Sequence, residues 1–415
     1  MKITDVTTIL TAPEKINLVV VKVHTSEKGL YGLGCATFTQ RYLAVKTAID
    51  DYLKPFVVGK DPAKIEDIWH SAWVSSYWRN GPVLNNALSG IDMALWDIKG
   101  KVARMPLYEL LGGKCREGVS VYRHADGRDE QEVEDSVRSY MEQGYHYIRC
   151  QMGQYGAAAL YGAGAEANRP AAIGATPDRF RSPKASPSGA YYDPDGYAMS
   201  VPRLFDHLRS TIGFGVELCH DIHERLPPIE AVRLAKALER HRLFFLEDPL
   251  PPEQLDWFKI IRSQCSTPLA MGELFANPND WMPLVTDRLI DFVRPHLSAI
   301  GGITPARKLA HLAEAFAIRT AWHGPGDVSP VGHAANIHLD LASPNFGIQE
   351  WAGMSDATRE VFPGCPEVHD GYVYPNDKPG LGIDIDEKKA ASYPCENILP
   401  SWTLARTPDG TSVWP

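Results

Sequence analysis

Three carboxylates recur along the chain at equal spacing. Asp221, Glu247 and Glu273 each end a short apolar stretch, and 26 residues separate each one from the next. That interval is about one strand–helix unit, so we expect the three side chains to converge. Carboxylate oxygens in this number suit Mg²⁺, and three converging carboxylates without a cation would raise at least one pKa. We therefore interpret the three residues as ligands of a magnesium ion.

Further ionisable side chains end the neighbouring apolar stretches. They are His124, Arg149, His223, Arg294, His323, Asp327 and Glu350. Any single one of them could be a surface charge or an ordinary buried histidine. Their recurrence at the ends of successive stretches is better explained by one shared mouth, into which strand ends point.

The elements that must position these residues follow a regular alternation. Eight short apolar segments are candidate strands, at residues 120–125, 145–151, 215–221, 242–249, 268–273, 291–295, 319–324 and 346–351. Amphipathic stretches separate most of them, at residues 130–142, 229–240, 255–263, 280–286, 305–316 and 334–341. The pattern predicts an α/β fold with a (β/α)8-type, TIM-like barrel over residues 118–380. A doubly wound sheet is disfavoured because no candidate strand leads into a glycine-rich dinucleotide loop.

Two other regions have a different pattern. Residues 1–117 begin with strand-like segments at 18–23 and 29–34 and continue with helical periodicity at 43–52, 65–75 and 84–102, which predicts a separate α+β domain. Residues 153–200 are rich in Gly, Ala, Pro, Ser and Tyr and have little periodicity. A segment this long after the second barrel strand favours an active-site lid or a subunit-contact loop over plain disorder.

The net charge and the distribution of apolar residues and cysteines argue against several classes of partner and location. The formal net charge is −9 and the sequence has no long basic run, so we expect neither nucleic acid nor a membrane surface as a partner. The first residues carry no apolar signal segment, and no stretch approaches the roughly 18 apolar residues of a membrane span. Seven scattered cysteines without metal-binding spacing are typical of reduced thiols, which predicts a cytoplasmic location.

Several motifs resemble the enolase superfamily. Residues 94–101 (ALWDIKGK) and 106–113 (PLYELLGG) resemble the end of its capping domain. The motifs Glu247-Asp248-Pro249 and Gly272-Glu273 resemble its second and third metal-ligand strands. Within the superfamily the chain is most similar to the D-mannonate dehydratase group, which also holds D-gluconate dehydratases and starvation-sensing proteins. That similarity is carried by residues 77–82 (YWRNGP), 220–223 (HDIH) and 379–384 (PGLGID).

The resemblance implies a reaction. Such enzymes remove the proton α to a carboxylate, and Mg²⁺ stabilises the charge of the resulting enediolate. The implied base is Tyr161, in the loop after the second barrel strand, with its pKa lowered by the neighbouring guanidinium of Arg149. His223 is two residues past Asp221, so on a continuing strand it would face the same way and could protonate the leaving hydroxyl.

The remaining polar residues are expected to bind the substrate. They are Thr39, His124, Glu273, Arg294, His323, Asp327 and Glu350. Racemases that use a Lys-x-Lys pair are disfavoured because residues 149–151 read Arg-Cys-Gln. Racemases that use a His–Asp pair are disfavoured because Arg294 stands where the aspartate would be. The resemblance also implies a C-terminal segment, residues 381–415, that packs on the capping domain, and a homo-oligomer of four or more subunits.

Two departures from the pattern of the group bear on substrate and rate. Thr39 stands where the group has an asparagine, and Pro325 follows Gly324, a proline that accompanies weak dehydration in the group. The function we expect is Mg²⁺-dependent dehydration of D-mannonate or D-gluconate to a 2-keto-3-deoxy acid, at low efficiency. The alternatives are a silent member that binds or senses such an acid, or an enzyme for another acid, including an epimerase with Tyr161 and His323 as its two bases.

Overall fold

The computed structural model describes residues 1–153, 187, 189–397 and 403–415, which form two compact units. Unit 1 consists of Met1–Val121, Gly272–Val285 and Val293–Asn397. Unit 2 consists of Tyr122–Met271, Thr286–Phe292 and Ile398–Pro415. No helix among the described residues is long and apolar enough to cross a membrane.

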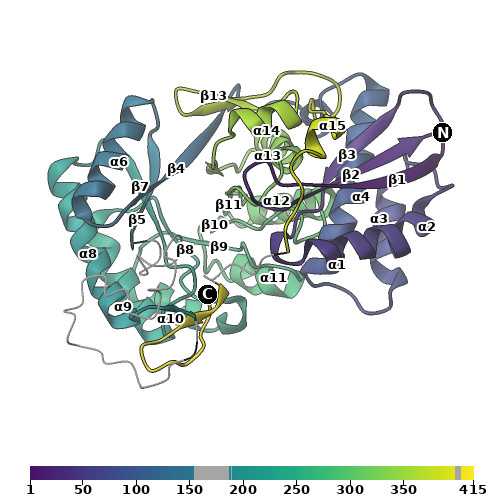
Figure 1. Ribbon diagram of the computed structural model, residues 1–415. Helices are drawn as coiled ribbons and strands as arrows, with labels where there is room; N and C mark the ends of the chain where they lie inside the picture. The colour runs from purple at the N-terminus through teal and green to yellow at the C-terminus, as the bar shows by residue number, and fades with distance from the viewer. Residues whose placement is uncertain (154–186, 188, 398–402) are drawn as a thin grey trace. The chain divides into compact units, whose positions relative to one another are not determined.

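Unit 1 opens with an antiparallel sheet of three strands in chain order: β1 (Ile3–Thr11), β2 (Leu18–Thr25) and β3 (Tyr31–Cys35). β2 is rich in β-branched valines, which favour the extended chain, and four of them are fully buried. The helix α4 (Pro82–Ala103) packs on β2 and β3 (Figure 1). The sequence predicted β2 and β3 but missed β1.

Shorter helices surround this sheet. They are η1 (Thr39–Arg41), α1 (Tyr42–Thr47), the π-helix η2 (Ala48–Leu53), α2 (Lys54–Val57), α3 (Ile65–Ser75) and α5 (Leu107–Leu110). The predicted helical stretch at 43–52 is therefore two consecutive elements, α1 and η2. The stretches at 65–75 and 84–102 correspond to α3 and α4.

A buried carboxylate explains the ALWDIKGK motif. Asp97 is fully buried in α4, and it accepts hydrogen bonds from the backbone N–H of Leu33 (2.9 Å), the backbone N–H of Leu381 (2.8 Å) and Lys101 Nζ (2.6 Å). One side chain thus joins α4 to β3 and to the PGLGID motif. Burial raises its pKa, against the opposing effect of Lys101.

Unit 2 holds a parallel sheet in the order β4-β5-β7-β8-β9. The bounds are β4 (Val119–Gly127), β5 (Tyr147–Met152), β7 (Glu217–Asp221), β8 (Phe245–Glu247) and β9 (Leu269–Met271). The helices that connect them are α6 (Glu130–Glu142), α8 (Pro194–Thr211), α9 (Pro228–Leu238) and α10 (Trp257–Gln264), with η3 (Glu239–His241) and η4 (Pro252–Gln254). Figure 1 shows these helices along the outer side of the strands.

The remaining strand–helix segments follow in chain order. They are α11 (Pro278–Thr286), β10 (Phe292–Val293), α12 (Ile303–Ala315), β11 (Arg319–Thr320), α13 (Pro330–Ala342) and β12 (Gln349–Glu350). Each of the eight candidate strands of the sequence corresponds to a strand of the structure. After them come α14 (Asp356–Val361), β13 (Glu367–His369), β14 (Tyr372–Tyr374) and α15 (Glu387–Ala390).

The predicted loop at 153–200 contains regular structure at its end. A short strand, β6 (Ala190–Tyr191), precedes α8, whose first turn is capped by the carboxylate of Asp193 and begins with Pro194. The apolar face of α8 is carried by Tyr197, Val201 and Leu204 and their successors, at helical spacing. The sequence missed this helix because its first turns lie within the Gly- and Pro-rich stretch.

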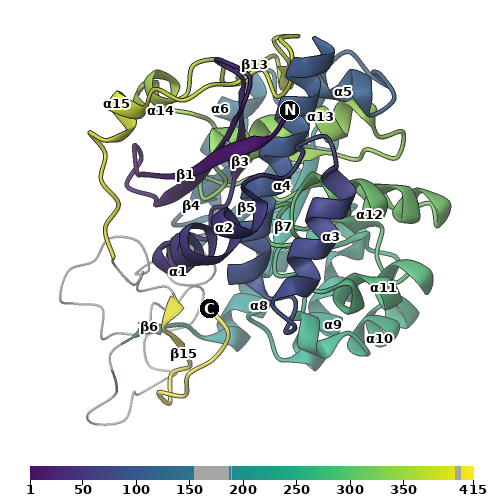
Figure 2. The ribbon, with the colours of Figure 1, turned by 90° about the vertical axis from the view of Figure 1, so that its right-hand side faces the viewer.

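The C-terminal region is divided between the two units. In unit 1, Ala12 donates to the carbonyl of Tyr393 (2.8 Å), and Asn17 Nδ2 donates to the carbonyl of Glu396 (2.7 Å). In unit 2, β15 (Ala405–Arg406) pairs in parallel with β6, as Figure 2 shows.

Candidate active site

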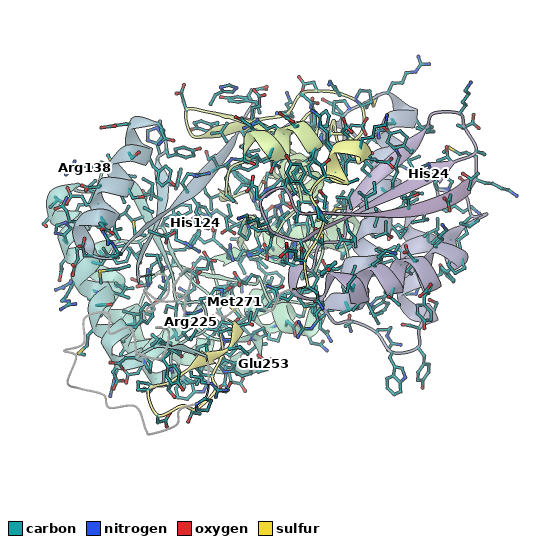
Figure 3. All side chains as sticks on the ribbon, in the orientation of Figure 1. His24, His124, Arg138, Arg225, Glu253 and Met271 are labelled. Atoms are coloured by element: carbon teal, nitrogen blue, oxygen red, sulfur yellow. The ribbon has the colours of Figure 1, made fainter. Side chains whose placement is uncertain are left out.

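The strand register of unit 2 brings Asp221 and Glu247, two of the predicted metal ligands, and Arg149, a predicted catalytic residue, to one end of the sheet. His124 on β4 lies opposite Arg149 on β5, and Asp221 on β7 lies opposite Glu247 on β8. Figure 3 labels His124 among the side chains inside this unit and Arg138, which lies on α6, at its outer edge. Because paired residues on neighbouring parallel strands point the same way, Asp221 and Glu247 are adjacent side chains on one face.

Buried charged side chains gather at this end of unit 2. Asp221 and Glu247 have no exposed surface, and Arg149 is 5% exposed. Arg149 donates to Asp221 Oδ2 at 3.1 Å, and the hydroxyl of Tyr122 lies 3.4 Å from Glu247 Oε2. Two buried carboxylates thus lie side by side, with a guanidinium bonded to one of them, and buried charge is kept where it is compensated. A divalent cation with oxygen ligands fits this donor set.

A third buried carboxylate of unit 2 was missed by the sequence analysis. Asp248 is 1% exposed and follows Glu247 directly, with a left-handed backbone at φ 36°. Its N–H donates to the carbonyl of Ala270 (2.9 Å), and its carbonyl accepts from the N–H of Glu224 (2.9 Å). The Glu247-Asp248-Pro249 motif was the available signal, although only its glutamate was assigned a role.

His223 does not lie on a continuing strand, so the reason given for its orientation was wrong. β7 ends at Asp221, and His223 and Glu224 form a turn with φ of 55° and 61°. The N–H of His223 donates to Asp221 Oδ1 at 2.7 Å, which ties the turn to the carboxylate. His223 is half-buried, and Nδ1 of its ring lies 2.9 Å from an oxygen of Pro415.

Unit 1 contains a second polar cluster, formed by a residue of β12 and by residues that follow β9, β10 and β11. Arg294 is fully buried and forms ion pairs with Glu273 (3.3 Å) and Glu350 (2.6 Å). Nε2 of His323 lies 3.3 Å from Glu273 Oε2, and the N–H of Gly324 donates to Glu350 Oε2 at 2.9 Å. The structure thus brings together four of the predicted substrate-binding residues.

The pKa values of the two histidines of this cluster are shifted in opposite directions. Burial by itself would lower the pKa of His323, but the carboxylates of Glu273, Glu350 and Asp327 outweigh burial and raise it to about 9. His296, whose ring centre lies 5.4 Å from that of His323, has its pKa lowered to about 4, mainly by burial. The sequence missed His296, which follows β10 by three residues.

Two other predicted residues remain, Thr39 and Tyr161. Thr39 lies in η1, half-buried, and its hydroxyl donates to the carbonyl of Asn17 at 3.1 Å. Tyr161, the predicted base, lies outside the described residues, as do positions 154–186 of the predicted lid.

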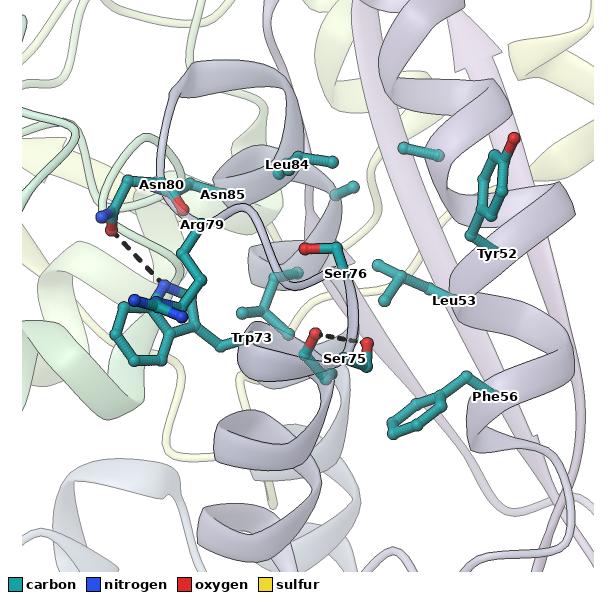
Figure 4. A pocket seen from close by; sticks show the side chains of 14 residues that line it. Tyr52, Leu53, Phe56, Trp73, Ser75, Ser76, Arg79, Asn80, Leu84 and Asn85 are labelled. Carbon is teal, nitrogen blue, oxygen red and sulfur yellow. Dashed lines mark hydrogen bonds between the residues drawn. The ribbon is translucent and has the colours of Figure 1, made fainter.

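An apolar cavity of about 390 Å³ in unit 1 has no such chemistry. Tyr52, Phe56, Trp73 and Leu84 contribute to its wall (Figure 4). Among the described residues that line it, Arg79 is the one charged side chain. Because its lining includes neither a carboxylate nor a histidine, this cavity cannot hold a magnesium ion.

Two protein-family models match the chain. Residues 2–112 match the mandelate racemase / muconate lactonizing enzyme N-terminal domain, and residues 184–389 match the enolase C-terminal domain-like family. A D-galactonate dehydratase family member of Salmonella enteritidis PT4 is 64% identical over 419 residues, which cover 100% of this chain and 99% of that protein. The family member RspA of Pantoea ananatis is 65% identical over 412 residues, which cover 99% and 98% of the two chains.

Solved structures are similar over the same length. The crystal structure of an enolase from Pantoea ananatis with bound D-gluconate and Mg superimposes with a TM-score of 0.95 at 62% identity, and covers 100% of both chains. A mandelate racemase/muconate lactonizing enzyme from Jannaschia sp. CCS1 has a TM-score of 0.81 at 24% identity, and covers 97% of this chain and 100% of its own. The second likeness bears on the fold alone.

Proposed function

We propose that this chain, which belongs to the enolase superfamily, dehydrates a six-carbon sugar acid to a 2-keto-3-deoxy acid with the help of Mg²⁺. Its fold is that of the superfamily, an N-terminal capping domain followed by a C-terminal barrel domain, so the predicted fold class is confirmed. The prediction of an enzyme of a sugar-acid dehydratase family that uses Mg²⁺ is likewise confirmed.

D-Gluconate is the substrate that we place first, with D-mannonate second. The observation that carries this choice is the Pantoea ananatis structure with D-gluconate and Mg, because it is 62% identical over the whole chain. The relatives carry the name of a D-galactonate dehydratase family, so D-galactonate is a third acid to test. These acids differ only in the configuration of their hydroxyls.

Asp221, Glu247 and Glu273 would hold the magnesium ion. When bound, the ion acts as a Lewis acid that draws charge from the carboxylate of the substrate. The donor set agrees with this role, since Asp221 and Glu247 are adjacent and buried and Arg149 donates to Asp221. Asp248, buried beside Glu247, adds to the negative charge that attracts a cation.

The proton transfers belong to residues of the chain. Tyr161 would remove the α-proton, with the guanidinium of Arg149 favouring the phenolate form. His223 would give its proton to the β-hydroxyl, which leaves as water when the carbon–oxygen bond breaks. The electron pair of the α C–H bond forms a double bond, and the resulting enol rearranges to the 2-keto-3-deoxy acid.

The remaining polar residues would orient the acid and its hydroxyls. Arg294 offers a buried guanidinium held between Glu273 and Glu350, and Glu350 offers an acceptor for a substrate hydroxyl. We assign His124, His323 and Asp327 to the same task. Thr39 is the weakest member of the set, because its hydroxyl already donates to the carbonyl of Asn17.

We further propose a homo-oligomer of four or more subunits and a cytoplasmic location. The second proposal is supported by the cysteines, since all seven are free thiols in the structure. Size-exclusion chromatography with light scattering would test the first.

The test of the reaction is a screen of purified protein with Mg²⁺ against aldonic and aldaric acids, with semicarbazide to detect 2-keto-3-deoxy products. A hit that disappears with EDTA and in His223→Asn would support the proposal and identify the substrate. Saturable binding of an aldonate without product would instead favour a binding or sensing member of the family. Exchange of the α-proton without loss of water would favour an epimerase.

A further inference from the structure

His296 has a buried imidazole ring in unit 1 to which no role has yet been given. It follows β10 by three residues and is 9% exposed. Its Nε2 is buried without a hydrogen-bond partner in the part of the chain that the structure describes. The large majority of buried side-chain polar atoms in native proteins have a partner, so a buried nitrogen without one needs an explanation.

The ring lies in the polar cluster that we propose as a binding site for the acid. Its centre is 5.4 Å from that of the His323 ring, and the two ring planes are inclined by 54°. The carboxylates of Glu273, Asp327 and Glu350 are close enough to act on the His296 ring electrostatically. We infer that His296 is a specificity residue, whose ring binds one hydroxyl of the sugar acid next to His323. The inference rests on the proposed function.

Two neighbouring side chains have buried polar atoms of the same kind. Nδ1 of His323 and Oδ1 of Asp327 are buried, and neither has a hydrogen-bond partner among the described residues. The other nitrogen of the His323 ring, Nε2, lies 3.3 Å from Glu273 Oε2. One cluster thus holds three polar atoms that a ligand rich in hydroxyls could satisfy, and a polyol acid has that chemistry.

The backbone holds both rings in place. The N–H of His323 donates to the carbonyl of Pro295 (3.3 Å), and Asn336 Nδ2 donates to the carbonyl of His323 (3.2 Å). The carbonyl of His296 accepts the N–H of Ile300 (3.3 Å). A ring held in this way loses little further freedom when a ligand binds, which favours selective binding.

A neutral imidazole is a suitable partner for a hydroxyl. Burial lowers the pKa of His296 to about 4, so at pH 7 the ring has one N–H donor and one nitrogen acceptor. A hydroxyl both donates and accepts, so either ring nitrogen can bind it. A site that hydrogen-bonds a hydroxyl rejects analogues that lack it, because the polar atoms of the site are then left unpaired. His296 would therefore distinguish sugar acids by one hydroxyl and take no part in the proton transfers.

The test compares the binding of D-gluconate with that of its 3-, 4-, 5- and 6-deoxy analogues. Calorimetric titration with Mg²⁺ is done in a His223→Asn background, to suppress turnover. His296→Phe keeps an aromatic ring beside His323 but removes both nitrogens, and His296→Gln restores a donor and an acceptor. His311→Phe is the matched control, because it makes the same change at an exposed histidine of unit 1.

The expected result is a loss of discrimination at one position of the acid. The background protein should bind D-gluconate at least about fivefold more tightly than one of the four analogues, as expected for one buried hydrogen bond. His296→Phe should lose this preference, and should bind that analogue within about twofold of the background protein. His296→Gln should regain part of the preference, and His311→Phe should keep all of it.

A second readout needs no ligand. His296→Phe removes a buried nitrogen that has no partner among the described residues, so the ligand-free variant should melt no lower than the background protein. A histidine with a purely structural role would give a lower melting temperature and an equal loss of affinity for all five acids. That result would overturn the inference.

The outcomes separate this inference from the proposed function. If His296→Phe keeps the preferences of the background protein at every position, the inference is wrong and the dehydratase proposal stands. If the folded, Mg²⁺-loaded protein binds none of the five acids, both are wrong.

Discussion

Arg294 is a fully buried cation of the polar cluster in unit 1 and pairs with both Glu273 and Glu350. We expect Arg294→Met to destabilise the metal-free protein by about 3–5 kcal/mol, because it removes the buried guanidinium that pairs with two carboxylates. Urea unfolding measures this loss. Arg307→Met, which removes an exposed pair with Glu66, should cost no more than about 1 kcal/mol. Equal losses in the two variants would contradict the importance of the buried pairs.

Glu247 is the residue whose charge bears most directly on the metal. Glu247→Gln should weaken Mg²⁺ binding by roughly a hundredfold or more, since residues that merely support a ligand are worth 10–100-fold. In the absence of metal it should not lower the melting temperature, because it removes one of two adjacent buried charges. Calorimetric titration and thermal unfolding with and without Mg²⁺ measure both effects. The exposed Glu253→Gln should behave as the parent, and a Mg²⁺-dependent shift retained by Glu247→Gln would count against the assignment.

The positions of the candidate site residues could be predicted from the sequence better than the side-chain contacts that each of them makes. The equal spacing of Asp221, Glu247 and Glu273 could be read directly, since one strand–helix unit has a typical length. The pairing of Arg294 with Glu273 could not, because it depends on side chains that follow different strands. Asp248 and His296 were missed for a related reason, since a buried and an exposed polar residue look alike in a sequence.

Among the elements, α4 depends on close contact with the PGLGID motif. A Cβ added at Gly100 would lie 2.6 Å from Cα of Gly380, which is backbone and cannot move aside easily. Alanine is the better helix former by about 1 kcal/mol, but overpacking costs about 1–3 kcal/mol. Gly100→Ala should therefore lower the melting temperature, as measured by calorimetry. Lys99→Ala, at an exposed neighbouring position, should leave it unchanged, and a Gly100→Ala protein as stable as the parent would contradict the packing argument.

The element boundaries show what periodicity can and cannot predict. Each candidate barrel strand is present, because alternating apolar segments and amphipathic helices are long-range patterns. The end of β7 at Asp221 could not be read from the sequence, and this is why the orientation of His223 was argued from the wrong geometry. The contact between His223 and Pro415 joins segments far apart in the chain, so no local pattern predicts it.

For the whole molecule, stability should fall in acid through buried neutral histidines. Burial lowers the pKa of His338 to about 4, and its Nδ1 accepts the N–H of Tyr108 at 3.1 Å. Below pH 6.5 the unfolded chain binds a proton that the folded chain refuses, so this contribution is complete above pH 6.5 and is lost as the pH falls toward 4. The loss is on the order of 1 kcal/mol per pH unit.

The variant His338→Gln isolates this contribution. Its free energy of unfolding, measured with urea between pH 6.5 and 4.5, should depend less on pH than that of the parent. The exposed His369→Gln should have the slope of the parent. A parent slope retained in His338→Gln would show that this histidine is not the group that titrates.

The fold that this chain shares with its relatives does not by itself identify the sugar acid that is turned over. Pro325 and Thr39 are the positions at which we expect this chain to depart from the dehydratase group, and we expect them to bear on rate and substrate rather than on the metal. The central claim is therefore that Mg²⁺-dependent removal of the α-proton leads to loss of water.

The most direct test follows D-gluconate and D-mannonate by proton NMR in heavy water, with the purified protein and either Mg²⁺ or EDTA. We expect loss of the α-proton signal and appearance of the 2-keto-3-deoxy product with at least one of the two acids, in the presence of Mg²⁺ only. Unchanged spectra of both acids with folded, Mg²⁺-loaded protein, or a product that forms equally well with EDTA, would contradict it.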